Sequence, residues 1–161
     1  MRADAVITLR ATGEGDADAM VEVYRRAVRA LGARDYTPEQ VEAWVSRGLD
    51  AARFRQKIAD GRKGWVAVDA EGRVCGFVDL EADGHIDFLY VDPDRAGQGV
   101  AGRLLAELEQ AARSAGLTGL HVEASETARP VFERHGYTVV RRRDFEISDV
   151  AIHNYAMKRR L

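Results

Sequence analysis

The segment with the clearest chemical potential is a glycine-rich turn at residues 97–102. It leads into residues 100–115, whose apolar members fall on one face of a helix. The first amides of a helix have no partners within it, and glycine lets a ligand approach the backbone closely. We therefore expect residues 97–102 to bind an anion such as a phosphate or a pyrophosphate.

A second candidate is His85, which begins the strand-like segment before that turn. Histidine titrates near neutrality, so its ring can accept a proton from a substrate. Asp87 lies two residues further on and shares the same face of an extended strand, where its carboxylate could raise the pKa of the ring or orient it. Glu81 and Asp79, on the preceding strand, are rival proton acceptors. A half-exposed, catalytically inert His85 at the start of a strand is the structural alternative.

These groups depend on the elements that position them. The hydrophobic periodicity and the turn residues predict helices at residues 12–31, 37–45, 51–60, 100–115 and 125–135. They predict strands at residues 5–11, 64–68, 73–81, 85–91, 120–123, 137–147 and 151–158. The strands on either side of the glycine-turn helix should be parallel, because a helix joins them. The remaining strands are joined by short turns or flank helices.

Length and composition indicate one globular domain, residues 1–161. The hydrophobic content is 46% and the net charge is −2, so no basic field points to nucleic acid and no apolar run points to a membrane. Cys75 is the only cysteine, which excludes an intrachain disulfide and a thiolate metal site, and we expect no metal. The N-terminus lacks a signal-peptide core, which predicts a cytoplasmic protein.

The wording VDPDRAGQGVAGRLL around the turn resembles the acetyl-CoA signature of the GNAT superfamily of N-acetyltransferases, V-x-P-x-x-[QR]-G-x-G-[IV]-[GA]-x-x-L-L. The later segment VEASETARPVFERHGY resembles the superfamily's second motif, with Ala128, Gly136 and Tyr137 in place. Together with YTPEQVEAW, it is most similar to the YafP-like branch. Two positions depart from the pattern: Ala96 stands where Arg or Gln is usual, and Phe132 where a tyrosine acid is usual.

The resemblance covers the whole order of elements and implies a GNAT fold of the α/β (α+β) class. In that fold a mixed, mostly antiparallel sheet of about seven strands is flanked by about four to five helices, and a parallel pair splays apart at its centre. Acetyl-CoA is the implied cofactor, with its pantetheine arm paired to the splayed strand and its pyrophosphate on the glycine turn. The residues implied in cofactor binding are Leu89, Tyr90, Val91, Arg95, Gly97, Gln98, Gly99, Val100, Ala101, Gly102, Ser125 and Phe132.

Acyl transfer to an amine needs a neutral amine, a site for the oxyanion and a thiolate that can leave. Some members of the superfamily carry a glutamate base at the spacing of His85 from the glycine turn, which adds to the case for His85. Because Phe132 cannot donate a proton, either the thiolate leaves unaided or Tyr155 or Ser125 protonates it. The expected walls of the acceptor pocket are Tyr24, Tyr36 and Trp44, although aromatic residues at helical spacing are more often core.

The resemblance implies direct transfer of an acetyl group, in a ternary complex, to a primary amine of a small molecule or peptide. The alternative is a non-catalytic sensor or interaction module that binds acyl-CoA, suggested by Ala96 and Phe132. A dinucleotide-binding oxidoreductase is excluded, because three antiparallel strands precede the glycine turn instead of a βαβ unit. A homodimer through the last hairpin is compatible with the sequence.

Overall fold

The computed structural model describes residues 6–161, which form eight strands, five α-helices and three short 3₁₀ turns. The strands are β1 (Thr8–Ala11), β2 (Lys63–Val68), β3 (Val74–Leu80), β4 (His85–Ile86), β5 (Leu89–Val91), β6 (Gly119–Ala124), β7 (Thr138–Ile147) and β8 (Val150–Arg160). The α-helices are α1 (Ala17–Leu31), α2 (Pro38–Val45), α3 (Ala51–Ala59), α4 (Val100–Ser114) and α5 (Arg129–Arg134). No helix within this part of the chain combines the length and the apolar composition that a membrane span needs.

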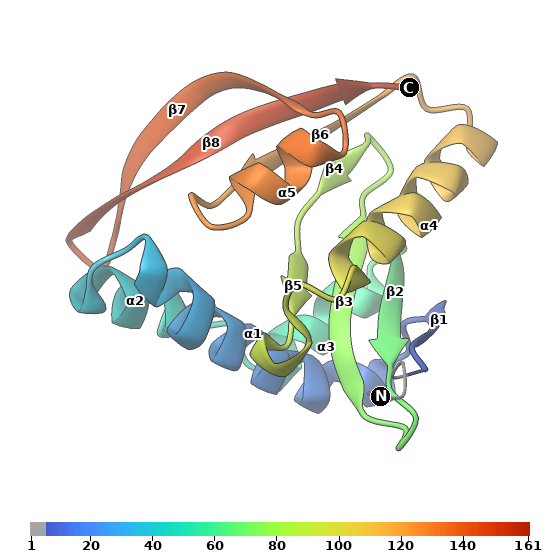
Figure 1. Ribbon diagram of the computed structural model, residues 1–161, viewed down its shortest axis with the longest axis horizontal. Coiled ribbons are helices and arrows are strands. Elements are labelled where there is room, and N and C mark those ends of the chain that lie inside the picture. Colours follow the sequence, from blue (N-terminus) through green and yellow to red (C-terminus); the bar gives the residue numbers. More distant parts are fainter. Residues whose placement is uncertain (1–5) are drawn as a thin grey trace.

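The strands form two four-stranded sheets. The first has the order β1-β2-β3-β5, and all its neighbours are antiparallel. The second has the order β4-β6-β8-β7, in which only β4 and β6 run parallel, as predicted. Figure 1 shows the long β7–β8 hairpin along the top of the molecule, with the chain passing from one sheet to the other between β4 and β5. The predicted mixed, mostly antiparallel architecture with a splayed parallel pair is confirmed.

The strand predicted at residues 85–91 is interrupted, which gives eight strands instead of about seven. A carboxylate from β3 occupies the interruption: Asp79 Oδ1 accepts hydrogen bonds from the amides of Asp87 (3.1 Å) and Phe88 (2.8 Å). Both amides are bound to this side chain and not to β6. The chain therefore leaves β6 after Ile86 and continues along β3.

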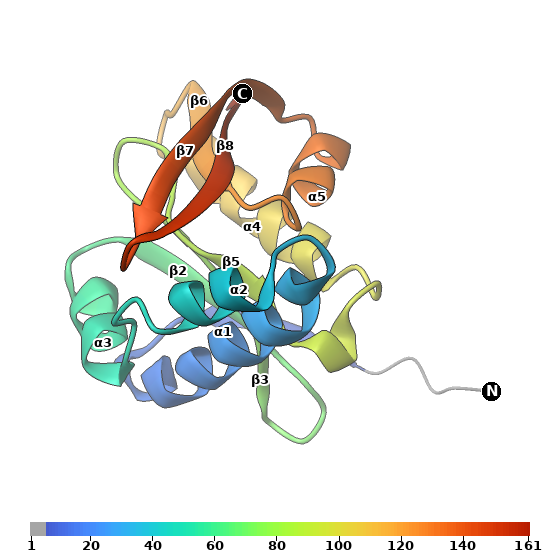
Figure 2. The same ribbon diagram turned by 90° about the vertical axis from the view of Figure 1, so that its left-hand side faces the viewer.

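Two hydrophobic cores lie on opposite faces of the sheets. In the first, α1, α2 and α3 pack against side chains of β2 and β3, including Val66 and Phe77. In the second, α4 packs against β3 and β6, and Phe132 of α5 is buried there with Tyr137. Figure 2 looks onto α2 and shows α1 and α3 beside it. The pocket described below lies between these helices, α4 and α5.

Local signals set several helix ends. Thr37 Oγ1 accepts from the amide of Gln40 (3.2 Å), and Gln40 Oε1 accepts from the amide of Thr37 (3.0 Å), which is the predicted capping box of α2. The helix predicted at residues 125–135 begins later, at Arg129. Ser125 Oγ accepts from the amide of Ala128 (3.0 Å), so Ser125 caps a turn that precedes α5. The strand predicted from Ala5 is β1, and Ala5 itself lies outside the described residues.

Candidate active site

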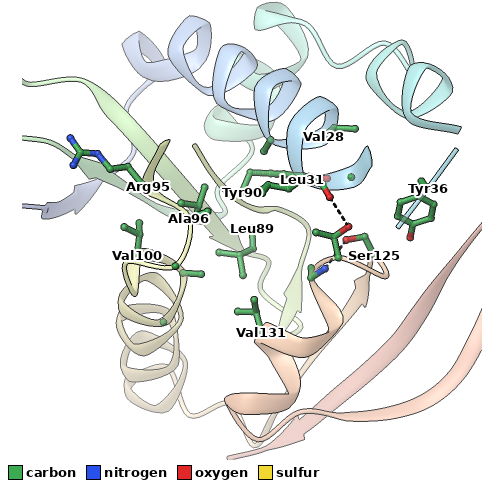
Figure 3. A pocket seen from close by; sticks show the side chains of 18 of the residues that line it. Val28, Leu31, Tyr36, Leu89, Tyr90, Arg95, Ala96, Val100, Ser125 and Val131 are labelled. Atoms are coloured by element: carbon green, nitrogen blue, oxygen red, sulfur yellow. Dashed lines mark hydrogen bonds between the residues drawn. The ribbon is translucent and has the colours of Figure 1, made fainter. Parts of the chain in front are cut away.

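A pocket of about 420 Å³ lies beside β5, at the point where the chain has left β6. One wall comes from the end of α1 and from α2, and the other from the glycine turn, the start of α4, and α5 with the turn before it. Figure 3 shows the two walls facing each other, with Val28 and Leu31 on one side and Val100 and Val131 on the other. A volume of this size is within the range of small-molecule sites, about 300–1,000 Å³.

Most of the residues expected to bind the cofactor line this pocket. They are Leu89, Tyr90, Val91, Arg95, Gly97, Gly99, Val100, Ala101, Gly102 and Ser125. The other two do not line it. Gln98 is exposed, and its side-chain amide donates to the carbonyl of Asp94 (3.1 Å). Phe132 is 1% exposed and packs edge-on against Tyr137 in the core. The sequence thus grouped ten residues that the fold brings together, and their role in binding stays a prediction.

The glycine turn has the geometry that an anion requires. Gly97 and Gly99 adopt φ angles of +75° and +79°, and a Cβ built on either would meet no atom within 4 Å. Gly99 is the N-cap residue of α4 and has no side chain to satisfy the first amides of that helix. The amides at the start of α4 therefore stand beside open space. The residues present fit a diphosphate at this position.

The backbone of β5 supplies a second binding element. The amide of Asp92 donates to Cys75 O (2.8 Å), and Phe88 O accepts from the amide of Asp79 (3.2 Å). In an antiparallel pair these contacts alternate, so the polar groups of Leu89 and Val91 point away from β3. Since β5 is the edge of its sheet, the amides of Leu89 and Val91 are open to an extended ligand.

Neither Ala96 nor Arg95 places a positive charge on the glycine turn. Arg95 Nη2 lies 3.5 Å from Asp69 Oδ2, on the β2–β3 connection. Figure 3 shows the Arg95 guanidinium directed away from the other labelled side chains. The other basic side chains that line the pocket are Arg134 and His135, at the end of α5. The sequence analysis did not single out these two residues, because only the fold brings α5 against the start of α4.

The opposite end of the pocket is aromatic. Tyr36 and Trp44 line it, as expected for an acceptor site. Tyr24 is fully buried and does not line the pocket; its hydroxyl donates to Trp44 O (2.6 Å), and its ring packs edge-on against Tyr90 at 4.9 Å. Tyr24 thus supports the wall that Trp44 forms.

A polar cluster adjoins this aromatic end and centres on Glu126. The amide of Glu126 donates to Tyr36 Oη (2.7 Å), and the Tyr36 hydroxyl donates to His153 O (2.9 Å). Glu126 Oε2 accepts from the Tyr155 hydroxyl (2.7 Å) and from His153 Nε2 (2.6 Å). Burial alone would raise the pKa of Glu126, but these two hydrogen bonds hold it below its usual range. Sequence reasoning named Tyr36 and Tyr155 but missed Glu126, for which no motif gives a signal.

The hydrogen bond between Tyr155 and Glu126 also changes the acidity of Tyr155. It raises the pKa of the Tyr155 hydroxyl, which makes the group a weaker acid. Tyr155 does not line the pocket, although Tyr36 connects its cluster to the pocket wall. Its proposed role as a proton donor to the thiolate stays a prediction.

His85 lies in a separate cluster and does not line the pocket. Its Nδ1 lies 2.7 Å from Glu81 and its Nε2 lies 2.5 Å from Glu123. Burial opposes the charged ring, but these two hydrogen bonds raise the pKa of His85. The Asp87 carboxylate, expected to orient this ring, forms no hydrogen bond with it and instead accepts from Arg62 (2.8 Å). The base role of His85 stays a prediction, and the ring has no free nitrogen with which to perform it.

Glu81, His85 and Asp87 also hold possible metal-ligand atoms within 4.8 Å of one another. All three are already bound to other groups: Arg62 lies between Asp79 and Asp87, and His85 is held by two carboxylates. The arrangement is that of an ion-pair network.

Comparisons with known proteins identify the family and the fold. The model of the acetyltransferase (GNAT) domain matches residues 32–159. The uncharacterized N-acetyltransferase YafP of Escherichia coli is 32% identical over 152 residues, which cover 94% of this chain and 95% of YafP. A GCN5-related N-acetyltransferase structure from Rhodopseudomonas palustris is 32% identical, with a TM-score of 0.89 and coverage of 100% of this chain and 99% of that one. The PaiA N-acetyltransferase of Thermoplasma acidophilum, solved in complex with coenzyme A, shares the fold at 18% identity, with a TM-score of 0.78 and coverage of 97% and 99%. The chain belongs to the GNAT family of acetyltransferases.

Proposed function

We propose that this protein transfers the acetyl group of acetyl-CoA to a primary amine of a small molecule or peptide, by direct attack in a ternary complex. The observation that carries the proposal is the pocket itself. It joins the open glycine turn, the free edge of β5 and an aromatic chamber in one continuous cavity. Membership of the acetyltransferase family supports the same cofactor.

Acetyl-CoA supplies an activated thioester, and the chain supplies its orientation. The amides at the start of α4 bind the diphosphate, and the outward amides of Leu89 and Val91 hold the extended arm. An amide from this edge also stabilises the negative charge that develops on the thioester oxygen. Tyr36 and Trp44 wall the chamber where the amine approaches and exclude water from it. Phe132 offers no proton, so the thiolate leaves unaided or takes a proton from Tyr155 or Ser125.

Two clusters compete as the acceptor of the amine proton. The first is His85 with its carboxylates, and the second is Glu126 with His153 and Tyr155. The Glu126 cluster contacts the pocket wall directly through the Tyr36 hydroxyl. We favour Glu126 for that reason. In an acetyl-transfer assay, Glu126→Gln should then lower kcat more than His85→Ala does, and the reverse order would assign the role to His85.

The cofactor site is tested by titrating acetyl-CoA in a calorimeter into the unchanged protein and into Gly99→Glu. A carboxylate at residue 99 would repel the diphosphate, so binding should be lost. Gly72→Glu is the matched control, because Gly72 has a φ of +81° and a Cβ there also meets open space, yet the residue lies outside the pocket. Absence of binding to the unchanged protein, or equal effects of both substitutions, would overturn the proposed site.

A sensor or interaction module is the second candidate, favoured by the departures at Ala96 and Phe132. Release of coenzyme A thiol, measured across a panel of amines and short peptides, separates the two functions. Tight cofactor binding with no thiol release for any acceptor would favour the module. Turnover with one class of amine would establish the enzyme and identify its acceptor.

A further inference from the structure

His135 occupies a position that exists only because residue 102 is glycine. A Cβ built on Gly102 would lie 2.8 Å from His135 Nε2 and 3.3 Å from Cε1. Cβ atoms in proteins almost never approach another atom as closely as 2.8 Å, so any side chain at residue 102 would displace the ring. Both residues line the pocket, Gly102 from the first turn of α4 and His135 from the end of α5. Figure 3 shows α5, marked by Val131, facing the helix that begins at Val100.

The orientation of the ring is fixed from its other side. His135 Nδ1 lies 3.2 Å from Val131 O, and since a carbonyl only accepts, Nδ1 carries the hydrogen. Nε2 is therefore the nitrogen left for a ligand, and no group within residues 6–161 hydrogen-bonds to it. This nitrogen lies on the turn of α4 whose backbone amides lack partners inside the helix.

The charges around His135 leave it suited to an anion. Its neighbour Arg134 lines the pocket and forms no ion pair with any residue that the structure describes. On α4, the Arg103 guanidinium is turned to Ile7 O (2.7 Å). The carboxylates nearby are engaged elsewhere, each by an arginine: Glu133 by Arg129 and Glu109 by Arg159.

We propose that His135 binds the diphosphate of the cofactor as an imidazolium, with Nδ1–H donated to Val131 O and Nε2–H to a phosphate oxygen, in place of the basic side chain that is absent at residue 96. Gly102 is the position that admits the ring. The inference rests on the proposed cofactor site and assigns a specific ligand within it. A charged imidazole donating to a phosphate oxygen forms a charge-assisted hydrogen bond, which is stronger than a neutral one.

The test compares two probes in a calorimeter, coenzyme A and pantetheine, which lacks the diphosphate. For His135→Ala we expect coenzyme A to bind about tenfold more weakly, since hydrogen bonds to charged groups contribute at least that much, and pantetheine to bind unchanged. His121→Ala is the matched control, because His121 is a half-exposed histidine outside the pocket. Thermal unfolding of each variant confirms that the fold is kept.

A double-mutant cycle separates a contact with the ligand from a general effect on α5. Gly102→Ala should weaken coenzyme A binding when His135 is present, because the added methyl group displaces the histidine ring. It should have little further effect in the His135→Ala background, where the methyl group has room. Full additivity, or equal losses for coenzyme A and pantetheine, would overturn this inference while leaving the proposed function intact. Failure of the unchanged protein to bind coenzyme A would overturn both.

Discussion

Replacement of Arg62 by Met should destabilise this protein far more than replacement of a surface arginine. The Arg62 side chain is 8% exposed, and its Nη1 hydrogen-bonds to Asp79 (2.7 Å) and Asp87 (2.8 Å). Its Nη2 pairs with Asp60 (2.9 Å). Burial alone would lower the pKa of Arg62, yet these carboxylates raise it, so the guanidinium stays charged. Methionine keeps much of the volume and removes the charge.

The size of the destabilisation follows from Asp79, the carboxylate that Arg62→Met leaves without its ion-pair partner. The Asp79 side chain is 9% exposed, so without Arg62 it becomes a buried charge that lacks its ion-pair partner. Breaking a buried ion pair on one side costs about 3–5 kcal/mol. For a domain of this size each kcal/mol shifts the melting temperature by about 2–4 °C, which predicts a fall of about 6–20 °C. Burial already raises the pKa of Asp79 to about 6, so protonation relieves the penalty and the loss should be smaller at acidic pH.

The measurement is urea unfolding of Arg62→Met, Asp79→Asn and the double variant, near neutrality and at acidic pH. Asparagine keeps the oxygen that accepts from the amides of Asp87 and Phe88, so it should partly rescue Arg62→Met. Arg142→Met is the control, because the Arg142–Asp144 pair is exposed and such pairs contribute about 0–1 kcal/mol. A loss for Arg62→Met no larger than that of the control, or additive effects in the double variant, would refute the reasoning.

Two further predictions concern β4. Gly84→Ala should be much more destabilising than Gly72→Ala in thermal unfolding: both glycines have positive φ angles, but only at Gly84 would a Cβ meet a backbone oxygen, that of Gly119, at 2.5 Å. Equal losses of stability in the two variants would show that the backbone of β4 and β6 shifts at little cost to make room for the methyl group. The pKa of His85 is raised in the folded protein. The stabilising contribution of His85 is therefore fully present at pH values below the pKa of the unfolded histidine, about 6.5, and is lost as the pH rises through the pKa in the folded state. In urea unfolding, the stability difference between the unchanged protein and His85→Gln should therefore shrink between about pH 6 and about pH 9. A difference that does not depend on pH would contradict the ion pairing of His85 with its carboxylates.

The parts of the fold that were predictable have local causes. The capping box of Thr37 and Gln40 defines the start of α2 within four residues of sequence. Gly99 at the start of α4 and Gly116 after its end both adopt positive φ angles. The positions of these two glycines in the sequence therefore indicate both ends of the helix. The turn at Ser148 and Asp149 is likewise local, with φ angles of +47° and +65°. Each signal acts over a few bonds, and sequence patterns report such signals well.

The break between β4 and β5 was not predictable, because its cause lies eight and nine residues away on β3. Nothing in residues 85–91 predicts that the amides of Asp87 and Phe88 bind a side chain instead of a neighbouring strand, and only the fold brings the Asp79 carboxylate to them. The Glu126 cluster has the same character, since its partners come from β8 and from the segment before α2. Side chains that satisfy distant backbone groups leave no period or motif in the sequence.

This break connects the ion-pair network to the pocket. If the amides of Asp87 and Phe88 were not bound to Asp79, residues 87–91 could continue along β6, and the outward amides of Leu89 and Val91 would then be used within a sheet. Asp79 and the arginine that neutralises it thus keep the edge of β5 free for the proposed cofactor, although neither lines the pocket beside β5. This also gives the acidic side chains around His85 a structural cause. They surround a buried guanidinium that maintains the break, whereas the proposed cofactor and acceptor sites lie beside β5, where the edge amides, the glycine turn and the aromatic residues line one pocket.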